Sequence, residues 1–233
     1  MSAAEPTDRK PEPASVPEAD TRTRLKHAAR RLFALHGVEF VSVRDIVAAA
    51  GQRNVGSLNY YFGSKEGLVQ ELAVDALKGI DAERNRKLDA VEAAGGPRSV
   101  REVLYLLTSF VYEPAADDDG TLMRFITMLM LNQRDLFVAA MNQTLDRGYR
   151  RCAAHIQRLL PDVPEPLIKQ RLMLMPLYMA AALSTREAAR ERSRAWGTFW
   201  SSPAAFENMI DTALGLLTQP PSEETLRLLA EED

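Results

Sequence analysis

The segment from Gly51 to Lys65 reads GQRNVGSLNYYFGSK, and its composition decides how the whole sequence is interpreted. It is polar and aromatic, and Val55, Leu58 and Phe62 are its only candidates for inward-facing side chains. Helical patterns flank it on both sides. We therefore expect most of its side chains to lie on a surface that contacts another molecule.

The sequence before this segment predicts a long helix that starts near Thr21. Apolar residues recur with helical spacing from Leu25 to Phe33. Gly37 follows them and is suited to a left-handed C-terminal cap. The preceding residues 1–19 are rich in proline and charge, so we expect a disordered tail there.

A second start signal follows at Ser42, which lies three residues before Asp45 and has the spacing of a capping box. It predicts a short helix over about residues 43–50. Gly51 then permits a sharp turn, and a further helix is expected over about residues 54–61. Two short helices joined in this way are typical of a helix-turn-helix.

The outward side chains of the second short helix suit contact with DNA. The major groove presents hydrogen-bond donors and acceptors, to which asparagine and arginine can pair. The charge supports this interpretation, because residues 20–65 hold eight basic and three acidic residues, whereas residues 66–233 hold 19 basic and 25 acidic residues. A basic head on an acidic body favours an anionic partner such as nucleic acid. A chance fluctuation in a short window is the alternative.

The remainder of the chain is predicted to be helical. Ser64 is the expected N-cap of a long helix that ends near Gly95. Later helices are expected over residues 100–112, 122–131, 136–160, 167–196 and 204–217, and no strand or repeat is recognised. The fold class is therefore all-α, with domains over 20–66 and 67–219 and a flexible tail over 220–233 that could hold one short helix.

Residues 21–72 resemble the DNA-binding domain of the TetR family of bacterial transcriptional regulators. The matching elements include AARRLF before Gly37, SVRDI from Ser42, and YFGSKE from Tyr61. Two departures are visible: the turn after Gly51 is one residue longer than usual, and Asn59 stands where the family often has tyrosine. The resemblance implies a homodimer that binds a palindromic double-stranded DNA operator. Outside this head, the body matches the family only in being helical.

The resemblance implies a role for nine residues of the head. Phosphate contacts are expected from Ser42, Tyr61 and Lys65. Base contacts are expected from six others, namely Arg44, Arg53, Asn54, Ser57, Asn59 and Tyr60. For Lys65 the alternative is a solvated side chain that pairs loosely with Glu66.

The central helices of the body are rich in methionine, which adapts to irregular apolar space. Through the resemblance, a cavity for a small apolar or amphipathic effector is expected there, although simple core packing is the alternative for any one side chain. The candidate ligand-binding residues are Met123, Met128, Phe137, Met141, Met173 and Tyr178. Pro176 is expected to kink its helix and help to open the cavity.

Homodimerisation is expected through the last two long helices. An apolar stripe from Phe206 to Leu217 could pair two copies, or it could pack within one subunit. Charged residues from Arg186 to Arg194 have the spacing of ion pairs along a helix. No function is assigned to residues 196–200.

The function expected is a ligand-responsive repressor that its effector releases from DNA. A DNA-binding dimer without a ligand is the alternative. An enzyme is not expected, because His27, His36 and His155 lack metal-ligand spacing and no phosphate loop or nucleophile elbow occurs. No metal or cofactor is expected. A single cysteine, no long apolar run and no secretory signal favour the cytoplasm.

Overall fold

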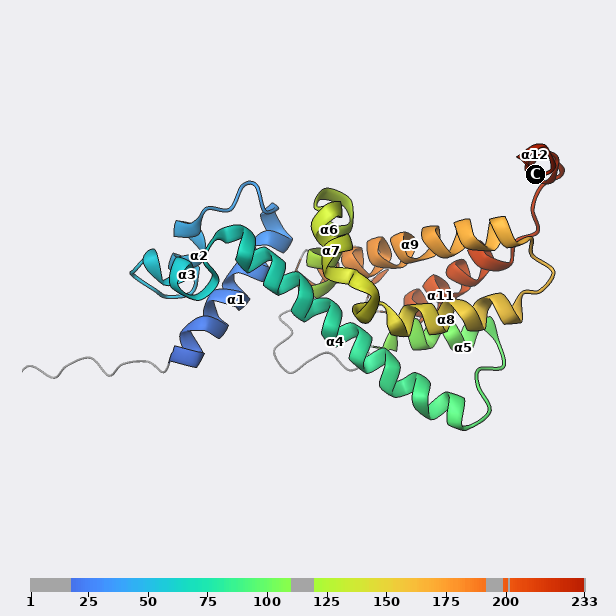
Figure 1. Cartoon of the computed structure of the whole chain (residues 1–233), viewed down its shortest axis with the longest axis horizontal. Coiled ribbons are helices and arrows are strands. Elements are labelled where there is room, and N and C mark those ends of the chain that lie inside the picture. Colours follow the sequence, from blue (N-terminus) through green and yellow to red (C-terminus); the bar gives the residue numbers. More distant parts are fainter. Residues whose placement is uncertain (1–17, 110–119, 192–198, 201, 233) are drawn as a thin grey trace, which may run out of the picture.

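The computed structural model describes residues 18–109, 120–191, 199–200 and 202–232, and these residues form helices without any strand (Figure 1). The all-α prediction is confirmed. The predicted N-terminal tail falls largely on residues 1–17, which lie outside the described residues. The helices are α1 Glu18–His36, α2 Val43–Ala49, α3 Gly56–Phe62, α4 Lys65–Ala93, α5 Val100–Leu107, α6 Leu122–Asn132, α7 Arg134–Leu145, α8 Arg147–Leu159, α9 Glu165–Glu191, α11 Pro203–Thr218 and α12 Glu223–Glu232.

The first three helices form a small head around one apolar core. Leu25, Phe33, Ile46 and Leu58 are fully buried and hold α1, α2 and α3 together. Leu68 adds the first turn of α4 to the same core. The helices α2 and α3 lie at the end of the head that points away from the body (Figure 1).

The long helix α4 joins the head to the body. Its N-cap is Ser64, whose hydroxyl accepts a hydrogen bond from the Gly67 amide at 3.1 Å, as predicted. The helix spans 29 residues and ends two residues before Gly95. Its first turns pack in the head, and its later turns pack against α7 and α8 of the body. A displacement of α4 would therefore be felt at both ends of the molecule.

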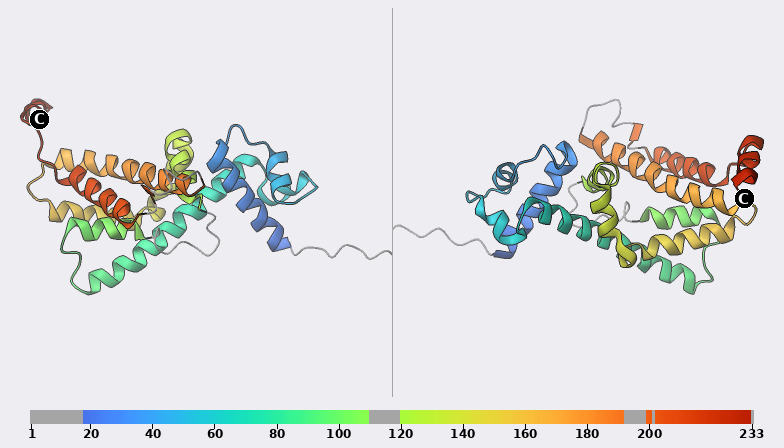
Figure 2. Two further views of the ribbon diagram at one scale, coloured as in Figure 1. Left: turned by 180° about the vertical axis from the view of Figure 1, so that it is seen from behind. Right: turned by 45° about the horizontal axis from the view of Figure 1, so that its top comes forward.

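The body is a bundle in which α9 lies between α6 and α11, and α5 packs against α8 and α11 (Figure 2). The helix α9 continues through Pro176 as one element. The apolar stripe of α11, which includes Phe206, Ile210 and Leu217, is buried inside the subunit. Of the two expectations for that stripe, the structure agrees with packing within one subunit.

Three predicted helices differ from the observed ones. The helix expected over residues 100–112 ends at Leu107. The helix expected over residues 136–160 is two helices, because the carboxylate of Asp81 on α4 accepts the Gly148 amide at 2.7 Å and so caps the start of α8. The second short helix of the head begins at Gly56 rather than near residue 54. Val55 was expected to face inward, but it precedes the helix and is 41% exposed.

Glu187, near the end of α9, makes a contact that the sequence did not predict. Both carboxylate oxygens of Glu187 accept hydrogen bonds, from the backbone amides of Met123 and Arg124, at 2.9 Å each. Glu187 therefore caps the N-terminus of α6 across the bundle. Residues 192–198, and with them Arg194 and Trp196, lie outside the described residues. A helix, α12, occupies most of the segment predicted as a C-terminal tail.

Candidate functional site

The start of α2 is held by the predicted capping box. The Ser42 hydroxyl accepts the Asp45 amide at 3.2 Å, and the Asp45 carboxylate accepts the Ser42 amide at 2.8 Å. The same carboxylate also accepts the Ser42 hydroxyl at 2.6 Å. The hydrogen bond from the Ser42 hydroxyl lowers the pKa of Asp45 the most, and the hydrogen bond from the Ser42 amide lowers it further. The hydroxyl hydrogen of Ser42 is thus already used within the head.

The turn between α2 and α3 depends on Gly51 and on a second local network. Gly51 has φ of +68°, a left-handed backbone conformation that glycine adopts more readily than other residues. The side-chain oxygen of Asn54 accepts the Gly56 amide at 2.8 Å, and its backbone oxygen accepts the Ser57 hydroxyl at 2.6 Å. A Cβ on Gly56 would lie 3.1 Å from that side-chain oxygen. Asn54 and Ser57 therefore shape the start of α3.

The outer face of α3 carries Asn59 and Tyr60. Tyr60 is 74% exposed, and its ring meets the Tyr61 ring edge to face with 5.0 Å between centroids. Tyr61 is half-buried and packs against the core. Arg53 in the turn and Arg44 on α2 are exposed as well. The head thus presents amide, phenol and guanidinium groups together at its outer end.

Several of the cations that make the head basic pair with α4. Arg22 contacts Glu71 at 2.6 Å, and Lys26 contacts Glu71 and, at 2.5 Å, Asp75. Within the part of the chain that the structure describes, no partner is recorded for the exposed side chains of Arg44 and Arg53. The positive charge available to an external anion is therefore concentrated near α2 and the turn.

Lys65 connects the start of α4 to the loop between α1 and α2. Its ammonium donates to the backbone oxygens of Val38 at 2.9 Å and Val41 at 3.1 Å, and so fixes the loop between α1 and α2. An ammonium has three N–H donors, which leaves one for a further acceptor. The loose pair with Glu66 is thus not its main contact.

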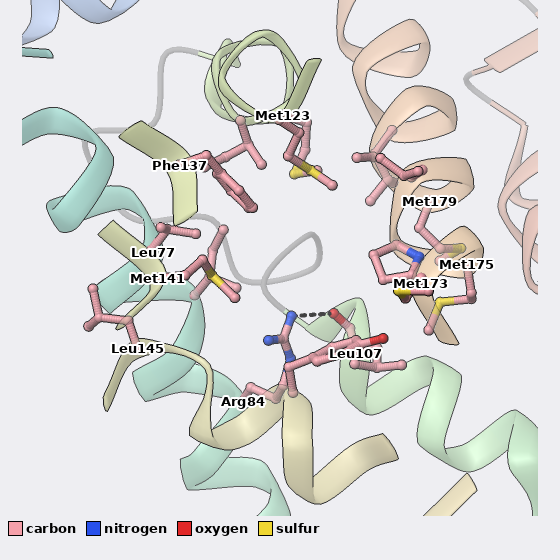
Figure 3. Close-up of a pocket in the computed structure, with 18 of the residues that line it drawn as sticks. Leu77, Arg84, Leu107, Met123, Phe137, Met141, Leu145, Met173, Met175 and Met179 are labelled. Carbon is pink, nitrogen blue, oxygen red and sulfur yellow. Dashed lines mark hydrogen bonds between the residues drawn. The ribbon is translucent and has the colours of Figure 1, made fainter. Parts of the chain in front are cut away.

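The body contains a cavity of about 510 Å³ between α4, α6, α7 and α9 (Figure 3). Methionine and other apolar side chains form most of its wall. Val138 on α7 and Met173 on α9 line it and are exposed, so the cavity opens between these two helices. Its volume falls within the range of small-molecule sites in proteins.

Four of the six candidate ligand-binding residues lie around this cavity, and two do not. Met123, Phe137, Met141 and Met173 line it. Met128 is buried in the core of the bundle. Tyr178 is on another side of α9, where its hydroxyl lies 3.5 Å from the backbone oxygen of Met209. Their placement follows from helix geometry, since Met123 and Met128 are five residues apart on α6 and face different sides.

The sequence analysis missed the polar groups of the cavity. Arg84 on α4 lines its inner end, and its guanidinium donates to the backbone oxygen of Leu107 at 3.2 Å (Figure 3). Tyr149 on α8 lies beside it and donates to the backbone oxygen of Leu172. Burial raises the pKa of Tyr149 to about 12. The only sequence signal was an arginine within a helix that carries apolar residues on both sides of it.

Other reactive groups do not gather into a site. Cys152 on α8 is buried, and this burial raises the pKa of its thiol to about 12, so it is a poor nucleophile. Among the described residues, no group of three or more His, Cys, Asp and Glu side chains could hold a metal ion. No helix in the described ranges is both long and apolar enough to cross a membrane.

The helix α6 connects the cavity to the head. Met123 and Ile126 of α6 line the cavity, and α6 also packs against α1. Beyond its end, the Gln133 amide donates to the Glu39 carboxylate in the loop before α2. Two helices, α4 and α6, therefore both line the cavity and contact the head.

Comparison with known proteins identifies the head. Residues 25–72 match the family described as bacterial regulatory proteins, tetR family. No curated protein matches the chain in sequence.

Solved structures share the fold over most of the chain. A protein from Shewanella sp. PV-4, assigned to the tetR family of transcription regulators, is 16% identical with a TM-score of 0.52; the match covers 84% of this chain and 95% of that one. A transcriptional regulatory protein named RHA5900 is 22% identical with a TM-score of 0.50, and the match covers 85% and 100%. At these identities the likeness shows a common fold.

Proposed function

We propose that this chain, which belongs to the TetR family of bacterial transcriptional regulators by its N-terminal domain, is a repressor that a small effector releases from its operator. The observation that carries the proposal is the outer face of the head, where Asn59, Tyr60, Arg44 and Arg53 are exposed together on and beside α3. Because regulators of this kind act on the chromosome, we propose that the protein works in the cytoplasm.

In the proposed complex, α3 enters the major groove of double-stranded DNA. Asn59 is suited to pair with adenine, and Arg44 or Arg53 with guanine or a neighbouring phosphate. Lys65 and Tyr61 are proposed to contact phosphates, Lys65 through its one remaining N–H donor. Ser42, Asn54 and Ser57 use polar atoms within the head, so we assign them mainly to shaping the surface that meets DNA.

The effector is proposed to occupy the cavity of the body. The wall is apolar and rich in methionine, which accommodates ligands of more than one shape. A bound molecule would press on α4 and α6, which line the cavity and also contact the head. Movement of either helix would change the spacing of the two α3 helices in a dimer, so that both could no longer reach their half-sites.

A homodimer is proposed through α9 and α11. The α11 stripe is buried within the subunit, so a different surface must supply the apolar contact. The outward face of α9 carries Leu174, Leu177 and Ala181, all exposed. Leu174 is 55% exposed and does not line the cavity. Two-fold pairing of this face would bury it in both copies.

Selection of bound fragments from a randomised pool of double-stranded DNA tests the proposal. We expect an enriched palindrome with half-sites about 34 Å or a multiple apart, bound more weakly as salt rises. A pool that is not enriched at low salt would contradict the DNA-binding role. Fluorescence anisotropy of the enriched fragment with candidate effectors would then show whether release occurs, and a fragment that every effector leaves bound would argue for a regulator without a ligand.

A further inference from the structure

The inner end of the cavity carries a cation, and no carboxylate is among the described residues that line the cavity. Arg84 reaches it from α4, and Figure 3 shows the guanidinium directed toward the space between Met141 and Met175. Among the described residues, the backbone oxygen of Leu107 is the one hydrogen-bond acceptor recorded for it, at 3.2 Å. Its Nε is shielded from solvent and has no partner there.

The nearest carboxylate is occupied by other groups. Asp81 lies one turn before Arg84 on α4, but one of its oxygens accepts the Gly148 amide at 2.7 Å and the other accepts the Asn85 side chain at 2.8 Å. Burial lowers the pKa of the Arg84 guanidinium. Arginine nevertheless keeps its proton in proteins, and it carries five N–H donors. Within the described ranges, the backbone oxygen of Leu107 accepts from one of these donors.

The other side chains of the cavity wall limit which ligand could accept hydrogen bonds from Arg84. Apart from Arg84, the inner part of the cavity is lined by apolar side chains together with Thr108 and Tyr149. Thr108 donates to the backbone oxygen of Leu104, and Tyr149 donates to that of Leu172, so both hydroxyl hydrogens are already used. A molecule that fits must therefore combine a hydrogen-bond acceptor at one end with an apolar remainder.

Resting on the function proposed above, we propose that the effector is an amphipathic carboxylate whose anionic group pairs with Arg84 and whose apolar part lies against the methionine-rich wall of α6, α7 and α9. A carboxylate matches the planar guanidinium with two parallel hydrogen bonds. It also brings negative charge to a wall whose lining, within the described residues, includes no carboxylate. A neutral ligand could fill the same space, but it would leave Asp81 as the carboxylate that acts on this cation.

A second arginine lines the cavity, and it serves as the control. Arg134 begins α7 and is exposed. A carboxylate bound there would be screened by solvent, and its pairing would contribute little. The inference therefore predicts that the carboxylate lies at the inner end and that its apolar part points toward the opening.

Calorimetric titration of the full chain with paired probes tests this inference. The first pair is decanoate and decanamide, and the second is naphthaleneacetate and naphthaleneacetamide; within each pair only the charge of the polar end changes. At least one carboxylate should bind about tenfold or more tightly than its amide, the factor expected when a charge-assisted hydrogen bond replaces a neutral one. Equal affinities in both pairs, or no binding of either carboxylate, would overturn the inference.

Two variants locate the carboxylate. Arg84→Met keeps the length of the side chain without its charge, and it should remove the preference for carboxylate over amide. Arg134→Met should leave that preference within about twofold. Circular dichroism and thermal melting of both unliganded variants check the fold, and Arg84→Met should melt no lower than the parent because a buried charge is removed. A preference lost in Arg134→Met and kept in Arg84→Met would reverse the orientation and overturn the inference.

The same probes separate this inference from the proposed function. If a carboxylate binds through Arg84 but leaves the enriched DNA fragment bound, the site is confirmed and effector-driven release is wrong. If the neutral amides release the DNA and the carboxylates do not, release is confirmed and the carboxylate inference is wrong.

Discussion

Two cations of the head are held in different ways, and this difference can be measured. The exposed side chain of Arg44 has no recorded partner in the described ranges, whereas Lys65 donates to the backbone oxygens of Val38 and Val41. We predict that Lys65→Ala lowers the free energy of unfolding by about 1.5–3 kcal/mol, the range for hydrogen bonds from a charged group. It should also weaken binding to all DNA sequences alike and flatten the salt dependence.

The matched control is Arg44→Ala, which should weaken DNA binding while chemical denaturation gives the same unfolding free energy as the parent. Denaturation and DNA titration are measured on both variants. If Lys65→Ala changed the preferred sequence but not the stability, both its tether and its phosphate contact would be wrong.

Asn59 is the residue of α3 that we propose reads a base. It is exposed on the outer face of the helix, and the amide of asparagine can form two hydrogen bonds to adenine. We predict that Asn59→Ala loses about 1–3 kcal/mol of discrimination at one base pair of each half-site. Titration of single-base operator variants measures this loss. Asn132→Ala, an exposed asparagine at the end of α6, should leave every preference unchanged; an Asn59 variant that behaves in the same way would exclude it from base reading.

At the scale of the element, the corner between α3 and α4 depends on a glycine that no sequence pattern singled out. A Cβ on Gly67 would lie 2.3 Å from the backbone oxygen of Phe62, the last residue of α3. We predict that Gly67→Ala forces the two helices apart and costs about 1–3 kcal/mol of stability, as overpacking does. Gly79→Ala lies on the same helix with nothing within 4 Å of its Cβ, so it should gain up to about 1 kcal/mol.

Chemical denaturation of these two variants measures the difference, and DNA titration shows whether the corner positions α3. Equal stabilities would mean that the backbone relaxes at no cost and that the close approach is not required.

The elements that the sequence predicts well are those with local signals. Ser42 with Asp45, Gly37 and Ser64 act through neighbours within a few residues, and each helix end they mark is observed. The break between α7 and α8 could not be predicted, because the group that caps α8 is Asp81 from a different helix.

The candidate sites follow the same division. Exposed residues of α3 could be named from the helix-turn-helix pattern and the family resemblance. The cavity residues could not be separated from the core, since methionine has the same pattern in both places, as Met123 and Met128 show. Arg84 could not be predicted as a cavity residue, because its guanidinium meets the apolar cavity only once the helices of the bundle have packed together.

At the scale of the whole molecule, the division of charge has two consequences. Acidic residues of α4 neutralise Arg22 and Lys26, which fastens α1 to the helix that leads into the body. The charge left on the head faces outward near α2 and the turn. In the proposed complex, the same arrangement that joins the head to the body leaves Arg44 and Arg53 to attract DNA, which would allow a protein of net charge -3 to bind a polyanion.

Coupling between the two ends of the molecule must be reciprocal. If an effector lowers the affinity for the operator by a given factor, the operator must lower the affinity for the effector by the same factor. We predict a factor of about 5–150, the usual range of such coupling. Titration of the effector with and without the enriched DNA fragment measures it. Effector affinity that DNA does not change, in a protein whose DNA affinity the effector does change, would show that the effector acts at a site other than the one titrated.

The proposed dimer gives the last prediction, because it would hold two heads at a fixed separation. Leu174 on α9 is 55% exposed, and burial of a leucine contributes about 1.5–3 kcal/mol. In a two-fold dimer each substitution occurs twice, so Leu174→Glu should raise the dimer dissociation constant by about a hundredfold or more. The control is Leu228→Glu on α12, where the leucine is 46% exposed and lies outside the proposed interface. Analytical ultracentrifugation over a range of concentrations should find Leu174→Glu monomeric where Leu228→Glu is still dimeric.

The monomer should keep its affinity for a cavity ligand and lose most of its affinity for the palindrome, because one head can reach only one half-site. A Leu174→Glu protein that stays dimeric would place the interface on another face of the bundle.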